Sequence, residues 1–373
     1  MYAATGAGLM SQPVRRATMA EVETMELGIF HEFHRAPGGS ETEAFDEAFA
    51  QAEAAEQYGF DAIWLAELHF SPSRSVLAAP MVIAAALAAR TRRLKIGSAV
   101  HVLPLSNPLR TAEEAATVDQ ISHGRFEFGI GRSGFPATYE RFGVPYGESR
   151  DRLFEHLDII KKAWTEETFS YRGEFFSYEN ITLIPKPFQK PHPPIRIAVN
   201  SADTYAVAGR LGLPIFVAVR LGSLMDLVEP LREYREAWKE AGHPGVGDVA
   251  LRLPVFVGRT KDAALSIPCE STMRFYRFLG ERLVESASIA GTRAIEDRAA
   301  RGARLGTITY EEAQRDKLAY GTPAMVIDRL RELRELLGLS AILAEMNCGQ
   351  QIPNPHILTS MRQFMEEVAP ALR

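Results

Sequence analysis

The stretch LKIGSAVHVLPLSNPLRTAEEAATVDQISHGRFEFGIGRS, residues 94–133, holds one complete unit of the fold. A short apolar run at Leu94–Ala99 predicts a buried strand, and Thr111–Ile121 has the apolar spacing of a helix. A second apolar run, Arg125–Gly131, predicts the next strand. Two buried strands joined by a helix are typical of a parallel sheet covered by helices. We therefore expect a fold of the α/β class.

The same alternation of strand and helix continues on both sides of this stretch. A helix begins at Ser40, where Glu43 completes a capping box, and ends at Gly59. Eight strand–helix units close most simply into a (β/α)8 TIM barrel, with a doubly wound open sheet as the alternative. No glycine-rich dinucleotide motif follows the first strand, which weakens that alternative. The predicted strands are Met25–Phe30, Phe60–Leu65, Leu94–Ala99, Arg125–Gly131, Ile195–Asn200, Pro214–Val219, Ala250–Val257 and Ala341–Met346.

Three segments depart from this rhythm. Residues 1–24 precede the first strand and are expected to be a poorly ordered extension of a single domain, residues 25–373. Residues 169–194 are rich in proline and are expected to be extended. Residues 260–320 are polar and rich in arginine, with weak periodicity. We interpret them as an insertion before the last strand–helix unit, partly helical and mobile.

Composition excludes several classes of protein. The net charge of −5 gives no reason to expect a nucleic acid or an anionic membrane as a partner. No apolar run approaches the roughly 20 residues that span a bilayer. Only Cys269 and Cys348 are present, which argues against a disulfide scaffold and fits a reducing cytoplasm. A soluble, cytoplasmic protein is expected.

In a barrel of this kind the functional residues follow the carboxyl ends of the strands. Several histidines fall there, although the chain has only nine. The spacing of His31 and His34 is not that of a zinc-binding helix, and no third ligand is evident, so no metal is expected. The residues at the predicted strand ends are His31, Glu32, His34, Glu67, His69, Val100, His101, Arg132, Ser133, Asn200, Ser201, Asn347 and Cys348.

A possible anion site lies after the fourth and fifth strands. Arg132 follows a strand that ends in glycines, and Asn200 and Ser201 open a helix that also carries Thr204. Free N–H groups at a helix start, hydroxyl groups and an arginine together suit a phosphate. The alternative is that Ser201 only caps the helix and Arg132 is a solvated surface charge.

Four segments resemble the bacterial luciferase-like flavin-dependent monooxygenases. They are FDAIWLAELHF (60–70), the stretch 94–133, IRIAVNSADTYAVAGRLGLPIF (195–216) and GTPAMVIDRL (321–330). The resemblance extends from Met25 to the C-terminus and is weakest over Lys261–Tyr320. It implies a (β/α)8 barrel that binds reduced FMN at its carboxyl-terminal mouth, or the deazaflavin F420 in some branches.

The resemblance also implies roles for individual positions. Ala99 and Val100 match the place where many members have a non-proline cis peptide beneath the flavin ring. Gly131 stands where luciferase has a reactive cysteine, which is one departure from the pattern. The positions that match residues around the flavin phosphate are Arg132, Asn200, Ser201 and Thr204.

The second departure concerns the histidines after the second strand. Luciferase has two consecutive histidines after the glutamate that corresponds to Glu67, whereas this chain has Leu68 and then His69. Efficient light emission is therefore not expected, and a different substrate is. His69 is the first candidate for an acid–base or substrate-orienting residue, and Glu67 is expected to orient its neighbours. His31 and His101 are weaker candidates.

The function that this resemblance implies is that of a two-component monooxygenase. A separate flavin reductase would supply reduced FMN, which reacts with O2 to give a flavin C4a-peroxide. That species would oxygenate a small organic substrate, with an aldehyde among the candidates. A homodimer is implied as well, and the mobile loop of luciferase implies that residues 260–320 act as a mobile lid over the mouth. The alternatives are an F420-dependent hydride-transfer oxidoreductase and a non-catalytic flavin-binding subunit, and the phosphate-binding positions argue against the latter.

Overall fold

The computed structural model describes residues 24–200, 202–219, 222–287 and 295–373. Within these ranges eight parallel strands form a closed barrel, because β12 pairs with both β10 and β1. The predicted (β/α)8 barrel is confirmed, and the open-sheet alternative is not. The barrel strands in order are β1 (Glu26–His31), β2 (Ala62–Leu65), β3 (Lys95–Ser98), β5 (Phe126–Gly131), β8 (Ile195–Ala198), β9 (Ile215–Ala218), β10 (Val249–Val257) and β12 (Ala341–Glu345).

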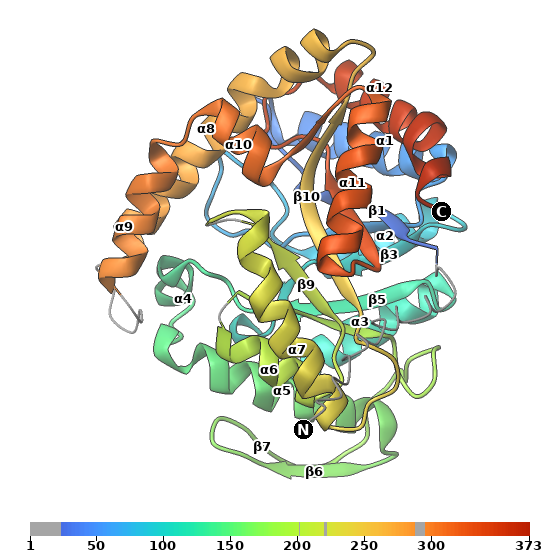
Figure 1. The fold of residues 1–373 in the computed structure, drawn as a ribbon. Helices are drawn as coiled ribbons and strands as arrows, with labels where there is room; N and C mark the ends of the chain where they lie inside the picture. Colours follow the sequence, from blue (N-terminus) through green and yellow to red (C-terminus); the bar gives the residue numbers. More distant parts are fainter. Residues whose placement is uncertain (1–23, 201, 220–221, 288–294) are drawn as a thin grey trace, which may run out of the picture.

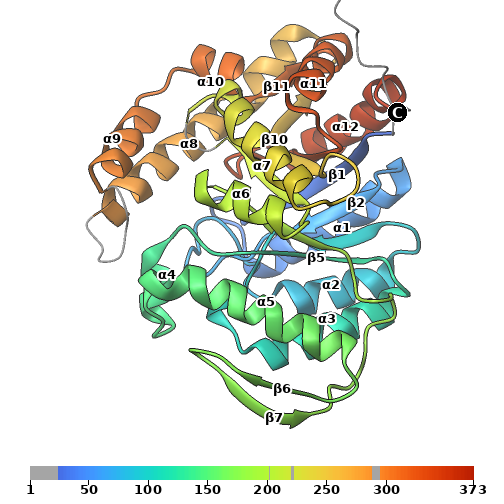
Figure 2. The ribbon, with the colours of Figure 1, turned by 60° about the horizontal axis from the view of Figure 1, so that its bottom comes forward.

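Four further strands lie outside this ring. β4 (His101–Val102) pairs with β5, and β11 (Ala319–Gly321) pairs with β10, both in parallel. β6 (Phe169–Arg172) and β7 (Ser177–Ile181) form an antiparallel hairpin at the bottom of Figures 1 and 2. This hairpin occupies part of the proline-rich segment that was expected to be extended.

Helices surround the barrel and follow the predicted pattern. Ser40 and Glu43 form the capping box of α1, and Gly59 ends that helix in the left-handed conformation. The helix at Pro108–Ser122 is capped by Asn107, whose side chain accepts hydrogen bonds from the two N–H groups that open the helix. The surrounding helices are α1 (Glu41–Tyr58), α2 (Pro80–Arg90), α3 (Pro108–Ser122), α5 (Ser149–Thr165), α6 (Ala202–Arg210), α7 (Val228–Glu240), α11 (Pro323–Leu337) and α12 (Asn354–Gln363).

Several shorter elements were not predicted. The short helix α4 (Pro136–Arg141) follows the loop after β5. Single 3-10 or π turns add to the connections and to the C-terminus, at Leu103–Leu105, Tyr146–Glu148, Leu224–Leu227, Phe364–Val368 and Ala369–Ala371.

Most of the described residues of the predicted insertion are helical. The insertion contains α8 (Lys261–Ala287), α9 (Ile295–Gly306) and α10 (Tyr310–Lys317), which gather on one side of the barrel in Figures 1 and 2. α8 and α9 approach closely, since a Cβ atom on Gly280 would lie 2.7 Å from the carbonyl oxygen of Gly302. Residues 288–294 of the insertion and 1–23 of the predicted extension lie outside the described residues.

The inside of the barrel is filled by a small apolar cluster. The Trp64 ring lies 4.9 Å from that of Phe216, edge to face. Glycine is required beside it, because a Cβ atom on Gly97 would lie 2.2 Å from the Trp64 ring. The cluster consists of Phe30, Ala62, Trp64, Ala66, Phe216, Ala250, Ala341 and Leu343. It closes the barrel below the mouth.

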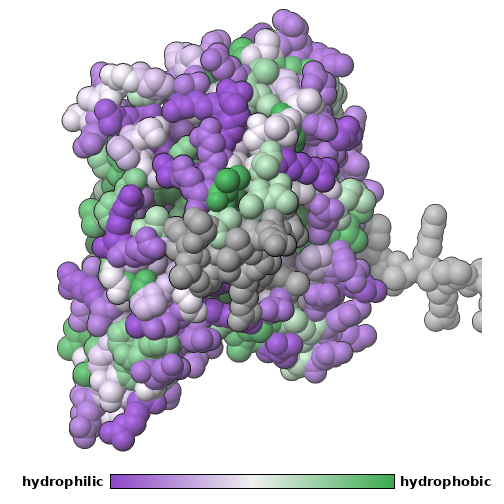
Figure 3. Space-filling model, turned by 90° about the vertical axis from the view of Figure 1, so that its left-hand side faces the viewer, coloured by the Kyte–Doolittle hydropathy of each residue, from purple (hydrophilic) through white to green (hydrophobic). Residues whose placement is uncertain are grey.

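The outer surface is mixed in character. On the face shown in Figure 3, hydrophilic residues are interspersed with small groups of hydrophobic ones. In the part of the chain that the structure describes, no helix combines the length and the apolar character needed to cross a bilayer.

Gly129 in β5 has the least room for a side chain of the glycines in the described barrel strands. A Cβ atom there would lie 1.7 Å from the Ser98 carbonyl oxygen and 2.7 Å from the Phe216 ring. We predict that Gly129→Ala lowers the free energy of unfolding by about 3 kcal/mol, as overpacking of a dense interior does. Gly147→Ala is the control, since no atom lies within 4 Å of its added Cβ. Equal denaturant midpoints for the two variants would contradict this account.

Candidate functional site

Glu67 is the centre of a buried hydrogen-bonded group just beyond the end of β2. Its Oε1 lies 2.9 Å from His69 Nε2, and its Oε2 lies 2.7 Å from His101 Nδ1. The Val102 N–H also donates to Oε2 at 3.0 Å. The structure therefore brings together two residues that were predicted as catalytic, Glu67 and His69, with the weaker candidate His101.

This arrangement favours a carboxylate at Glu67 and a charged imidazole at His101. Burial by itself raises the pKa of Glu67, but His101, His69 and the Val102 N–H together lower that pKa to about 2. Burial likewise lowers the pKa of His101, and the charge of Glu67 and its hydrogen bond outweigh that effect and raise it. The lowered pKa of Glu67 and the raised pKa of His101 both favour the ion pair.

His69 differs from His101 in being open to a cavity. Its side chain is 14% exposed, and it lines a cavity of about 160 Å³. Because Nε2 faces the Glu67 carboxylate, it carries the proton, and Nδ1 has no hydrogen bond to any described residue. His69 is thus positioned to accept or return a proton at Nδ1.

The cavity lies between the carboxyl ends of the strands and the insertion. Residues after β2, residues of the segment from Ser133 to Arg141 and residues of α8 form its wall. The lining combines apolar and aromatic side chains with three arginines, two glutamates, one histidine and three hydroxyl residues. Among the lining residues are Leu68, Phe70, Arg74, Val102, Phe135, Arg141, Phe278, Arg282 and Glu285.

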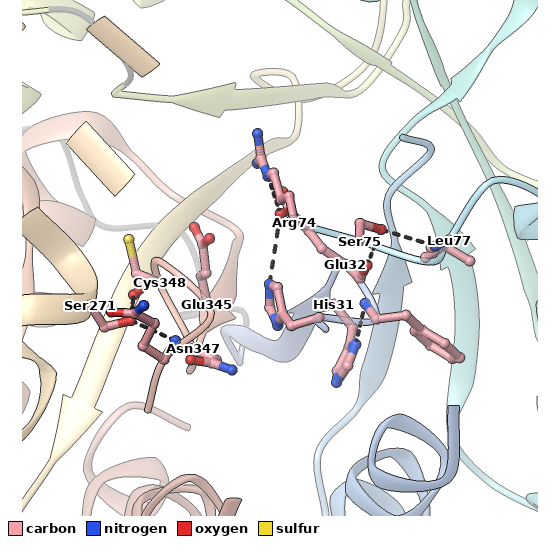
Figure 4. A network of polar contacts seen from close by, with 12 residues as sticks. His31, Glu32, Arg74, Ser75, Leu77, Ser271, Glu345, Asn347 and Cys348 are labelled. Atoms are coloured by element: carbon pink, nitrogen blue, oxygen red, sulfur yellow. Dashed lines mark hydrogen bonds and ion pairs between the residues drawn. The ribbon is translucent and has the colours of Figure 1, made fainter. Parts of the chain in front are cut away.

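A second group of charges is buried beside this cavity (Figure 4). Arg74 donates to both carboxylate oxygens of Glu32, with Nε at 2.7 Å from Oε2. Arg252 bridges Glu32 at 3.1 Å and Glu345 at 2.8 Å. Burial raises the pKa of Glu32, but the two arginines hold it well below its ordinary value. No local sequence pattern predicts this network, although Arg252 within an otherwise apolar strand is a signal of it.

Both ring nitrogens of His31 have hydrogen-bond partners inside the protein. His31 Nε2 lies 2.9 Å from Gln51 Oε1, and its Nδ1 accepts the Phe33 N–H at 3.0 Å. Burial lowers the pKa of His31 to about 4, so the ring is neutral. His34 Nε2 lies 3.7 Å from Glu32. Among the described residues, no group of three or more His, Cys, Asp or Glu side chains is arranged to hold a metal ion.

The predicted phosphate-binding positions lie near the starts of two helices. Arg132 Nη1 donates to Ser149 Oγ at 3.1 Å, at the start of α5. Arg150, the next residue of α5, lies 3.6 Å from Asp203 at the start of α6. Thr204 is buried and Asn200 is exposed, whereas Ser201 lies outside the described residues. Ser149 and Arg150 were not predicted, because only the fold brings α5 to this end.

Small residues form a half-buried apolar floor at the mouth. The Ala99–Val100 peptide is cis, as expected. Leu68, Ala99, Val100 and Ala198 are partly exposed and pack on the Trp64 cluster. Gly131 leaves no room for a side chain, since a Cβ atom there would lie 2.7 Å from Val100 Cγ2. A flat aromatic ring system fits such a floor, with the Arg132 region beside it for an anionic tail.

Comparison with known proteins identifies the class. Residues 25–340 match the family model of the luciferase-like monooxygenases. The chain therefore belongs to the luciferase-like monooxygenase family, whose members are flavin-dependent oxidoreductases.

Two relatives and one solved structure illustrate this membership. The alkanal monooxygenase alpha chain of Photorhabdus luminescens is 31% identical over 59% of this chain and 60% of its own length. The oxygenase component of the flavin-dependent trigonelline monooxygenase of Acinetobacter baylyi is 27% identical over 89% of this chain and 91% of its own. The oxygenating constituent of 3,6-diketocamphane monooxygenase from Pseudomonas putida, solved with FMN, superposes with a TM-score of 0.78. It is 23% identical over 94% of this chain and 99% of its own, a likeness that bears on the fold alone.

The Glu67–His101 pair gives a defined dependence of stability on pH. The pKa of Glu67 is lowered, so its contribution is complete above about pH 4.5 and is lost as the pH falls toward 2. The pKa of His101 is raised, so its contribution is complete below about pH 6.5 and is lost as the pH rises through the raised value. The pair should stabilise the fold most between these limits.

We predict that Glu67→Gln lowers the free energy of unfolding by about 3 kcal/mol near pH 6, because it leaves His101 without its buried partner. The deficit should shrink above the pKa of His101, and denaturant unfolding at several pH values measures it. Glu53→Gln is the control, since the Glu53–Arg90 pair is about half exposed. A deficit that is constant from pH 5 to pH 9 would exclude this coupling.

Proposed function

We propose that this chain is the oxygenase component of a two-component flavin monooxygenase. It binds reduced FMN delivered by a separate flavin reductase and, with O2, oxygenates a small organic substrate through a flavin C4a-peroxide. The observation that carries the proposal is the cavity at the barrel mouth, where His69 lines a wall of mixed apolar and polar residues beside the half-buried apolar floor. The trigonelline monooxygenase component, which matches most of the chain, supports the same assignment.

The flavin ring would rest on Ala99, Val100 and Gly131, and its phosphate would lie at the start of α6. Arg132 would supply a guanidinium there, and Arg150 adds a second one nearby. Phosphate contacts of this kind fix the cofactor while the apolar floor positions the ring. The remaining phosphate-binding positions are Asn200, Ser201 and Thr204.

His69 would exchange a proton with the substrate or with the oxygenating species at Nδ1. Glu67 acts through His69 and is a positioning residue, because it fixes the tautomer that leaves Nδ1 free. His101 keeps Glu67 in place through the ion pair at 2.7 Å. Leu68, which replaces the first luciferase histidine, makes the neighbouring wall apolar and favours exclusion of water.

The deciding experiment compares FMN with F420. We expect anaerobic titration to show tight binding of reduced FMN and weak binding of reduced F420. Mixing the FMN complex with O2 should then give the transient absorbance of an oxygenated flavin. Preference for F420 without an oxygen reaction would instead assign hydride transfer. FMN binding without any oxygen reaction would indicate a non-catalytic subunit. In the same experiment, His69→Gln should keep the FMN affinity and change the decay rate of the transient.

The insertion would act as the cover of this site. Phe278, Arg282 and Glu285 of α8 close one side of the cavity. We predict that Phe278→Ala increases hydrogen peroxide release per O2 consumed several-fold, because water then reaches the oxygenated flavin. FMN affinity should stay unchanged. Val284→Ala, at a half-exposed position on the same helix, is the control. Equal peroxide yields in both variants and the wild type would refute a covering role.

A further inference from the structure

The cavity beside His69 has a basic side that the flavin chemistry does not require. Arg74, Arg141 and Arg282 all line it, each from a different segment of the chain. Their hydrogen-bond and ion-pair partners differ, and this difference indicates which of them can still bind a ligand.

Arg74 is buried, with 4% of its surface exposed, yet one edge of its guanidinium is available to a ligand. Its Nε and Nη2 both donate to Glu32, and its Nη1 has no hydrogen bond to any described residue. Glu32 is itself fixed by Arg252, so the Arg74 guanidinium is held in place at the edge of the cavity that Arg74 lines. A guanidinium held in this way presents a preorganised donor edge to an anion.

Arg141 supplies charge that no described carboxylate neutralises. It lies exposed at the rim, with its guanidinium carbon 5.2 Å from the centre of the Phe70 ring. Arg282, in contrast, is paired with Glu285 at 3.0 Å. Glu67 is already paired with His101, so it does not offset Arg141. The cavity therefore carries unneutralised positive charge.

Apart from the arginines, the wall combines apolar and aromatic side chains with Glu67, His69, Glu285 and three hydroxyl residues. Leu68, Phe70, Val102, Phe135 and Phe278 line the same cavity as the arginines. A volume of about 160 Å³ accommodates a molecule of one ring. Apolar walls provide affinity for the body of a ligand, and a few placed polar groups determine its orientation.

We propose that this cavity binds an organic carboxylate with a small ring as its body. The carboxylate lies on Arg74 Nη1 and Arg141, and the ring lies between the phenylalanines, within reach of His69. This inference rests on the proposed function, since it names the substrate class of the same site. It differs from the neutral aldehyde considered from the sequence.

The test uses flavin-free protein in phosphate buffer, in which simple anion sites are occupied by phosphate. Calorimetry compares benzoate with its neutral isostere benzamide. We expect benzoate to bind at least about tenfold more tightly, because only a carboxylate forms charge-assisted hydrogen bonds with the two guanidinium groups. Equal or tighter binding of benzamide would overturn the inference.

Substitutions locate the bound anion. Arg141→Gln should weaken benzoate about fivefold to tenfold and leave benzamide unchanged. Arg74→Lys keeps the charge beside Glu32 but removes the free Nη1 edge, and it should also weaken benzoate. Arg110→Gln, on α3 and outside the cavity, removes the same charge and should have no effect. Unfolding midpoints verify that each variant is folded. Benzoate affinity that is the same in the wild type and in both cavity variants would show that benzoate binds elsewhere, and the inference would be wrong.

The experiments can refute either proposal without refuting the other. If reduced FMN binds and reacts with O2 while benzoate shows no preference over benzamide, the carboxylate inference is wrong and the oxygenase function stands. If benzoate binds at the arginines and no flavin binds, the proposed function is wrong and the anion site stands.

Discussion

The Glu32 carboxylate, buried between Arg74 and Arg252, is the interaction on which the barrel mouth depends. A buried charge without a partner costs several kcal/mol, so each member of this group constrains the others. Arg252 extends the group to Glu345, and Arg74 extends it to the cavity wall between the rings of Phe275 and Phe278. The loop after β2 is thereby held against both the barrel and the insertion.

The interior of the barrel changes character along its axis. The lower part is the apolar cluster around Trp64 and Phe216, where glycines allow large rings to pack. The upper part is charged, with the Glu32 network on one side and the Glu67–His101 pair on another. Leu68, Ala99 and Val100 lie between these regions as an apolar floor. A flavin ring and a substrate bound as proposed would therefore meet apolar surfaces with fixed charges around them.

The insertion shows why local patterns were least informative there. α8 packs Tyr276 and Leu279 into the core and presents Phe278 and Arg282 to the cavity. Apolar side chains are therefore needed on more than one face of the helix. A helix with partners on several sides has no single apolar stripe, and its periodicity in the sequence is weak. The predicted ends of some strands also differ from the observed ends, by a few residues. The run at Ile195–Asn200 is apolar for longer than the pairing of β8, which stops at Ala198.

The order of strands and helices, the capped start of α1 and the Glu67-Leu68-His69 triplet could all be predicted from the sequence alone. These features depend on neighbours a few residues apart, which periodicity and capping rules describe. Only the tertiary structure decided that Arg74 and Arg252, 42 and 220 residues from Glu32, share its carboxylate, and that α8 forms a wall of the cavity. Such contacts follow from closure of the barrel, which brings distant strand ends to one mouth, and no local pattern encodes which side chains meet there.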